Sequence, residues 1–286
     1  MSQISELHRI ELNTLKKVAE ICDTNHIKYL LIGGSLLGAI RHDGFIPWDD
    51  DVDIGMRRDD YDRFASLTPA LLQNTHYFMQ TADTDPNFAF SYMKILDTDT
   101  YIKERNNVND ARKGVFVDIF PFDKVPRQPE IRRAVYSRFR YFDARILIRL
   151  GYNIIKTPFR KDPETNDLDH YMSVAKLKEK RENIMRLYNK EPFHHYKNYA
   201  SQYAYDKEVL NQAEISELVT HQFENIQVKI PEAYDRILKR MYDDYMTLPP
   251  DRDQKEKHVD TLIVNGKNRV YTFWYWWITD TSFYFE

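Results

Sequence analysis

Hydrophobic positions recur at helical spacing near the start of the chain and then give way to short apolar runs. One stripe consists of residues spaced three, four and three apart: Leu12, Leu15, Ala19 and Cys22. This spacing predicts an amphipathic helix over residues 3–26. Further strands are expected at 29–32, 51–56, 77–80, 88–96 and 115–120, and short helices at 36–41 and 59–67. Helices that alternate with strands over the first 125 residues predict an α/β or α+β core.

The stretch 126–161 differs from this core because it contains ten Lys and Arg residues against two acids. Its apolar residues stand at helical spacing: Ile131, Val135, Phe139, Phe142, Ile146 and Leu150. The pattern predicts a basic amphipathic helix. Two interpretations are open, namely a helix packed on the core with a solvated face, or peripheral contact with anionic lipid or an anionic polymer. Residues 162–170 have the composition of an exposed loop, and 171–190 predict another charged helix.

The chain therefore divides into three predicted segments within one domain. Residues 1–125 form the catalytic core, 126–210 a helical and partly basic insertion, and 211–286 a C-terminal segment that packs back on the core. Nine of the last sixteen residues are aromatic. This favours a strand in the core or at a subunit interface over sugar stacking or anchoring at a membrane interface.

Composition narrows the class of protein and its compartment. The chain has 286 residues and a net charge of −3, which argues against bulk electrostatic binding to nucleic acid. Its single cysteine, Cys22, excludes a disulfide within the chain and fits a reducing compartment. The first ten residues lack a secretory signal pattern, and no apolar run approaches the ~20 residues that span a bilayer. We expect a cytoplasmic protein. Of the two interpretations of residues 126–161, contact with anionic lipid would place it at the inner membrane face.

An acidic segment, PWDDDVDI at 47–54, carries the strongest chemical signal. Residues two apart on a strand share a face, so Asp49, Asp51 and Asp53 point the same way if strand pairing starts early enough. Three carboxylates on one face are costly unless a cation neutralises them. Because apolar residues alternate with these acids, the strand is partly buried. A metal site is therefore favoured over an acidic surface loop.

A glycine turn precedes this acidic segment by about sixteen residues. Gly33 and Gly34 allow the backbone to approach a ligand closely. Ser35 stands near the start of a helix, where free N–H groups and the helix dipole favour a phosphate. A phosphate-binding turn beside metal-binding carboxylates predicts a site for nucleotide phosphates.

Two other kinds of site share part of the pattern of the acidic segment. An EF-hand loop starting at Asp49 needs glycine at its sixth position and glutamate at its twelfth, where this chain has Ile54 and Asp60. Calcium binding of that type is therefore rejected. The pair Asp51 and Asp53 also matches the Asp-x-Asp motif of many nucleotide-sugar glycosyltransferases, but that motif is too short to discriminate.

The order of these motifs resembles a known family. Gly-Gly-Ser followed by Asp-hydrophobic-Asp-hydrophobic is the pattern of the polymerase-β-like nucleotidyltransferase superfamily. Five longer matches are similar to the LicD family: GSLLGAIRH at 34–42, GFIPWDDDVDI at 44–54, R-x-DY at 58–61, GVFVDIFPFD at 114–123 and Y-x-DYM-x-LPP at 242–250. The resemblance implies an α+β fold with a polymerase-β-like core, a small mixed sheet flanked by helices, a helical insertion and a C-terminal extension.

The resemblance also implies roles for individual residues. Asp49, Asp51, Asp53 and Asp118 would bind Mg²⁺ or Mn²⁺, and the last three would be catalytic. Ser35, with the backbone of Gly33 and Gly34, would hold a donor phosphate. By position more than by motif, we add three cations near the phosphates: Arg41, Arg58 and Lys94. Arg58 has the alternative of pairing with Asp60 at a helix start. His42 and His258 are candidate acid–base groups, although a lone histidine is more often structural.

The expected reaction is the transfer of phosphocholine, or another phospho-alcohol, from a CDP-activated donor such as CDP-choline. The acceptor is a hydroxyl of a cell-surface glycan (teichoic acid, capsule or lipopolysaccharide), lipid-linked forms included, and CMP leaves. Alternatives are a nucleotidyltransferase that adds NMP from NTP to a small molecule or protein, and a non-catalytic module of glycan assembly. The chain departs from the family where Asp243 follows Tyr242 in place of the usual glycine, and across 150–210. These departures concern the acceptor site more than the metal site.

Overall fold

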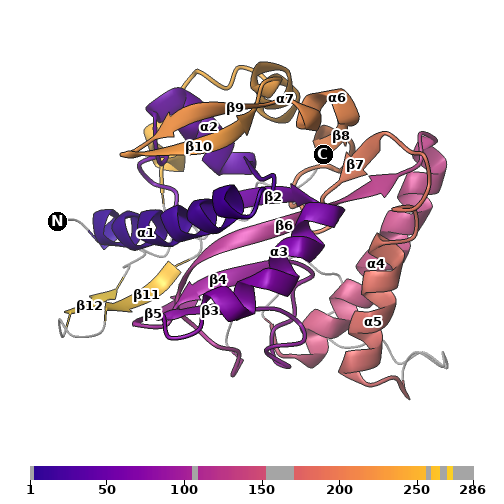
Figure 1. Ribbon diagram of the computed structural model, residues 1–286, viewed down its shortest axis with the longest axis horizontal. Coiled ribbons are helices and arrows are strands. Elements are labelled where there is room, and N and C mark those ends of the chain that lie inside the picture. Colours follow the sequence, from indigo (N-terminus) through magenta and orange to yellow (C-terminus); the bar gives the residue numbers. More distant parts are fainter. Residues whose placement is uncertain (1–2, 105–108, 153–170, 256–258, 265–268, 273–286) are drawn as a thin grey trace.

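A mixed sheet forms the centre of the molecule (Figure 1). The computed structural model describes residues 3–104, 109–152, 171–255, 259–264 and 269–272. The sheet has the order β1-β2-β6-β4-β3, and β7 and β8 continue from β6. Its strands are β1 (Leu30–Leu31), β2 (Asp53–Arg57), β3 (Tyr77–Gln80), β4 (Met93–Asp97), β6 (Val115–Val125), β7 (His195–Lys197) and β8 (Val209–Asn211). Only the pairing of β2 with β6 is parallel.

Two helices cover one face of this sheet, α1 (Gln3–Thr24) and α3 (Arg58–Leu71) (Figure 1). Apolar side chains from the helices and strands meet there and are fully buried: Val18, Phe64, Ile54, Val117 and Ile119. Burying such side chains stabilises the fold by roughly 1.5–3 kcal/mol each. This core holds the strands in place. The polar residues of the candidate site lie on the opposite face of the sheet and at the ends of its strands.

The remaining elements surround the sheet. Above the sheet in Figure 1 lie α2 (Gly33–His42), the hairpin of β9 (Leu218–Phe223) and β10 (Ile226–Pro231), α6 (Gln212–Ser216) and α7 (Tyr234–Tyr242). On the other side lie the packed helices α4 (Pro129–Arg149) and α5 (Val174–Met185). A second sheet joins β5 (Thr100–Glu104), β11 (Val259–Val264) and β12 (Arg269–Thr272).

Several predicted elements are confirmed and others are corrected. The first helix is confirmed as α1, and the strand at 77–80 matches β3. The predicted end of a strand at Pro121 was wrong, because β6 continues to Val125. β6 pairs with β4 over residues 115–119 and with β7 over residues 123–125. Pro121 lies between these two ranges, so its missing N–H removes no hydrogen bond to β4 or β7. The strand predicted at 88–96 starts only at Met93, and β5 was missed.

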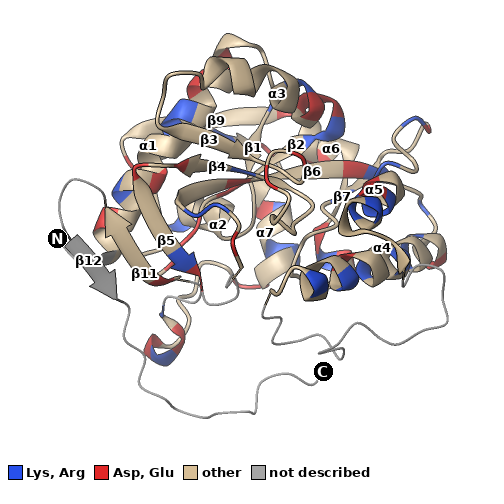
Figure 2. Cartoon of the chain, turned by 90° about the horizontal axis from the view of Figure 1, so that it is seen from below, with Lys and Arg blue, Asp and Glu red and all other residues tan. Residues whose placement is uncertain are grey.

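The basic segment forms α4, whose apolar side packs inward. Phe139, Phe142 and Ile146 are fully buried against neighbouring elements. This supports the interpretation of a helix packed on the core, with exposed arginines at 133, 138 and 140. Figure 2 marks the Lys and Arg positions along the helix in blue. The described helix ends at Arg149. Residues 153–170 lie outside the described part of the chain. Residues 273–286, which include most of the C-terminal aromatic residues, lie outside it as well.

Candidate metal and phosphate site

Three adjacent strands bring three charged residues into one row. In the sheet register, Asp53 of β2 lies opposite Asp118 of β6, and Asp118 lies opposite Lys94 of β4. Side chains of directly opposed residues share a face of the sheet. Lys94 Nζ stands 3.4 Å from Asp118 Oδ1 and 3.5 Å from Glu104 Oε1. Sequence reasoning missed Glu104, because it did not identify the strand that carries it.

Asp49 and Asp51 reach this region from a loop. The strand begins at Asp53, so Asp49 and Asp51 precede it, and the condition for aligning all three acids by strand alternation is not met. The loop nevertheless gathers carboxylate oxygens of Asp49, Asp50 and Asp51 within 4.8 Å of one another. Asp50 is buried and its Oδ2 accepts a hydrogen bond from the Val259 N–H at 2.9 Å, which ties the loop to β11.

The glycine turn faces these carboxylates through its backbone. A Cβ atom on Gly34 would stand 2.6 Å from Asp49 Oδ2, closer than Cβ atoms approach other heavy atoms, so a side chain at residue 34 would displace Asp49. Gly33 adopts φ +54°, in the left-handed region that favours glycine, and the helix α2 begins there. Both glycines therefore allow the start of α2 to lie against the acidic loop.

Ser35 connects the turn to the strand. Its Oγ accepts a hydrogen bond from the backbone N–H of Asp53 at 2.8 Å, and the side chain is buried. The hydroxyl thus positions the first residue of β2 relative to α2. The contact of Ser35 with a donor phosphate stays a prediction. The hydrogen bond to Asp53 is a separate, structural role of the same hydroxyl.

The carboxylates raise one another's pKa values. Burial, and then the charges of Asp51 and Asp118, raise the pKa of Asp53 well above its ordinary value. Burial raises the pKa of Asp118 to about 7, against the opposing effect of Lys94. The Oδ1 atom of Asp118 is buried and accepts no hydrogen bond from the described residues. Such a donor set fits a hard divalent cation, which takes carboxylate oxygens as ligands and would offset the repulsion.

Arg41 and His42 lie in the last turn of α2, close to the acidic loop. Arg41 Nη1 donates to the carbonyl oxygen of Tyr245, and Arg41 Nε donates to His42 Nε2, each at 3.0 Å. Because His42 Nε2 accepts, its imidazole is neutral, and burial together with Arg41 lowers the pKa of His42. The charge of Asp49 acts on Arg41, so Arg41 remains a candidate for a phosphate contact. His258 lies outside the described residues.

Arg58 lies in a different cluster from the one predicted. Its Nε and Nη2 donate to the carboxylate of Asp123 at 2.7 and 2.6 Å, and Nη1 donates to Glu182 at 2.9 Å. The side chain is buried, and its partner is Asp123 and not Asp60. All three nitrogens of the guanidinium thus have carboxylate partners. We therefore remove Arg58 from the expected phosphate ligands.

Sequence reasoning assigned no role to two tyrosines that lie beside the turn. The hydroxyls of Tyr203 and Tyr242 hydrogen-bond to each other. A Cβ on Gly33 would stand 3.7 Å from the Tyr203 hydroxyl and 3.6 Å from Asp53 Oδ2. Tyr203 lies within residues 150–210, where the chain departs from the family motifs. Only its position in the fold therefore indicates a role.

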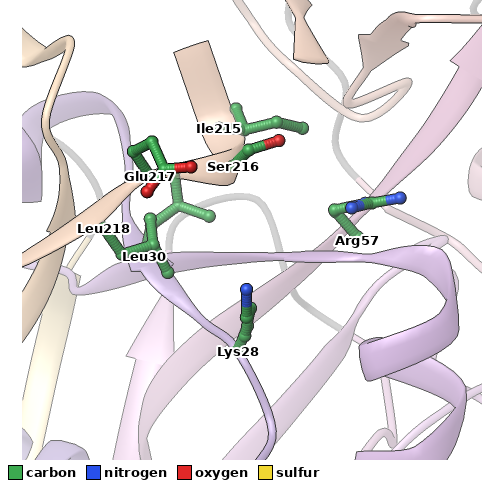
Figure 3. Close-up of a pocket in the computed structure, with 7 residues that line it drawn as sticks. All are labelled: Lys28, Leu30, Arg57, Ile215, Ser216, Glu217 and Leu218. Atoms are coloured by element: carbon green, nitrogen blue, oxygen red, sulfur yellow. The ribbon is translucent and has the colours of Figure 1, made fainter. Parts of the chain in front are cut away.

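A cavity of about 140 Å³ lies elsewhere, at the opposite end of β2. Its lining includes Lys28, Arg57 and Glu217 (Figure 3). None of the predicted site residues contributes to it, so we do not connect it with the carboxylates.

Comparison with known proteins places the chain in a family. Residues 26–146 match the family model described as LicD/FKTN/FKRP, nucleotidyltransferase domain. The chain is 31% identical over 272 residues to lipopolysaccharide cholinephosphotransferase LicD of Haemophilus influenzae, a match that covers 91% of this chain and 98% of that protein. It is 29% identical over 109 residues to the ribitol 5-phosphate transferase FKRP of Homo sapiens, covering 38% and 19% of the two chains. The chain belongs to the LicD family, as its motifs predicted.

Proposed function

We propose that this protein transfers a phospho-alcohol from a CDP-activated donor to a hydroxyl of a cell-surface glycan, and that CMP is released. Phosphocholine is the preferred group, since the relative matched over nearly its whole length is named a cholinephosphotransferase. The observation that carries the proposal is the row of Asp53, Asp118 and Lys94 beside the Gly33–Gly34 turn. We also infer that the sheet is a polymerase-β-like nucleotidyltransferase core.

In this proposal Asp49, Asp51, Asp53 and Asp118 hold Mg²⁺ or Mn²⁺. Such a cation neutralises charge on the phosphate oxygens and on the leaving CMP. The start of α2 would receive a donor phosphate at its free N–H groups. Lys94 and Arg41 supply further positive charge.

Asp118 is our choice for the group that accepts the proton of the attacking hydroxyl. The hydroxyl oxygen forms a bond to the phosphorus that bears the alcohol, and the bond from this phosphorus to the oxygen of CMP breaks. The proton moves to the Asp118 carboxylate. Nucleotidyl transfer would instead attack the α-phosphorus and leave the nucleotide on the acceptor.

The test is CMP release by the purified protein with Mg²⁺ and a glycan acceptor. CDP-choline, CDP-ethanolamine, CDP-ribitol and CDP-glycerol form one panel, and NTPs and UDP-sugars form the other. We expect release from one CDP-alcohol and none from Asp51→Ala, whose far-ultraviolet circular dichroism should match the wild type. Turnover of NTPs or UDP-sugars alone would replace the proposal with nucleotidyl or glycosyl transfer.

A further inference from the structure

A glutamate occupies the buried face of α1. Glu11 is separated by four residues from both Leu7 and Leu15, and by seven from Val18, all of which are fully buried. Residues at these intervals share one side of a helix. Glu11 itself is only 1% exposed. An apolar residue would pack there without cost, and glutamate is almost never fully buried unless it is paired.

The Glu11 carboxyl group differs in its contacts from the other buried acid of the helix, Glu6. Glu11 Oε2 accepts no hydrogen bond from the described residues. By contrast, buried Glu6 on the same helix pairs with Arg9 at 2.9 Å. An unpaired buried carboxylate costs several kcal/mol. A cation from outside the described residues would offset this cost at Glu11.

The helix also contacts the acidic loop directly. His8 Nε2 donates to the backbone carbonyl of Asp49 at 2.7 Å, and the His8 ring stacks on Phe45 at 4.0 Å between centroids. Glu11 follows His8 by three residues, one turn along the same side of the helix. The charges that act most on Glu11 are accordingly those of the loop, Asp51, Asp50 and Asp49, followed by Asp118.

We propose that Glu11 is a further ligand of the divalent cation, supplied by α1 from outside the matched family range of 26–146. This inference rests on the proposed metal site. Lys94 does not serve as the partner of Glu11 in the described structure, because Asp118 and Glu104 engage it. A cation bound by Asp49 and Asp51 would remove the repulsion between these residues and Glu11. It would also fix α1 against the loop.

The experiment measures Mn²⁺ binding by electron paramagnetic resonance on the full chain, with neither donor nor acceptor present. Glu11→Gln keeps the shape and removes the charge, and we expect the affinity to fall by about tenfold or more. The matched control is Glu20→Gln on the same helix, whose side chain is 65% exposed and which should bind as the wild type does. Equal affinity of the folded Glu11→Gln variant and the wild type would overturn the proposal.

A second measurement needs no variant, in case Glu11→Gln does not fold. Fe²⁺ replaces the metal in the wild-type protein, and ascorbate with peroxide then cleaves the backbone near the bound ion. Cuts near residue 11 as well as near 49–53 are expected, and cuts at 49–53 without any near residue 11 would reject Glu11. Failure of the wild type to bind Mn²⁺ at all would instead reject the proposed metal site itself.

Discussion

Strand β6 carries two buried aspartates, Asp118 and Asp123, that differ in their polar contacts. The carboxylate of Asp123 receives two hydrogen bonds from Arg58 and one from Asn189 at 2.6 Å. Asp118, five residues earlier and thus on the other face of the strand, has Lys94 Nζ at 3.4 Å from its buried Oδ1, a longer contact than those of Asp123. The charge of Asp123 is matched by close hydrogen bonds, whereas Asp118 shares one lysine with Glu104.

We interpret the difference as one between a structural charge and a charge that the proposed metal site uses. A buried ion pair with good geometry holds elements together, here β6 with α3 and α5 through Arg58 and Glu182. Buried acids that raise one another's pKa values repel each other. Carboxylates perturbed in this way are candidates for a functional site, and in the proposed function a divalent cation offsets their repulsion.

The largest expected effect is on turnover at Asp118. Asp118→Asn should lower the rate of CMP release by on the order of a thousandfold, because in the proposed function the carboxylate both binds the cation and receives the proton. The free energy of unfolding should stay the same or rise. Initial rates and urea unfolding measure the two quantities, with exposed Asp206→Asn as the control. Nearly wild-type turnover would remove Asp118 from the chemistry.

The next effect concerns the satisfied pair. Arg58→Ala should lower the free energy of unfolding by about 3–5 kcal/mol, since it leaves Asp123 buried without its partner. Arg63→Ala, which removes a half-exposed arginine with a 4.0 Å ion pair, should change it by less than about 1 kcal/mol. Equal losses in the two variants, measured by urea unfolding, would contradict the contrast drawn here.

The pH dependence of stability sharpens the comparison. In metal-free protein the pKa of Asp118 is raised from 3.8 to about 7, so the folded state retains a proton that the unfolded state has lost. The contribution of Asp118 to stability is therefore fully present below pH 4 and declines as pH rises to about 7. Urea unfolding with a chelator should show this decline in the wild type and a smaller one in Asp118→Asn. Parallel curves would argue against the raised pKa.

Exposed charges on α4 give the smallest effect. Arg138→Gln with Arg140→Gln should weaken binding to phosphatidylglycerol vesicles by roughly 2 kcal/mol in total, about 1 kcal/mol for each residue. Both arginines are exposed, whereas the apolar side of α4 is buried. Sedimentation at low salt measures the binding, and high salt should abolish it. Wild-type protein that does not sediment would reject the membrane contact.

No helix in the described part of the chain is long and apolar enough to cross a bilayer.

Local patterns were sufficient for much of the fold. The stripe of α1 and the compact strand β3 could be predicted because one period dominates each of them. The strand β5 was missed because its inward positions include Thr100 and Glu104, which hide the apolar alternation. Its partner β11 lies more than 150 residues later, and no local pattern indicates such a pairing.

The candidate site was predictable where motifs were dense. Asp49, Asp51 and Asp53 were found through their spacing, although two of them lie in a loop and not on the strand. Glu11 could have been found as a lone acid within an apolar stripe. The true partner of Arg58 could not, because Asp123 is 65 residues away and meets it only through the sheet.

The central claim is that the acidic cluster is completed by a cation, and the most direct measurement is the stability gained on adding Mg²⁺. The free energy of unfolding would be compared with and without Mg²⁺ for the wild type, Asp53→Asn and Asp123→Asn. Mg²⁺ at a hundred times its dissociation constant should stabilise the wild type by about 2.7 kcal/mol. Asp123→Asn should keep this gain from a lower starting stability, and Asp53→Asn should lose it. Equal gains in all three proteins, or none in the wild type, would contradict the account.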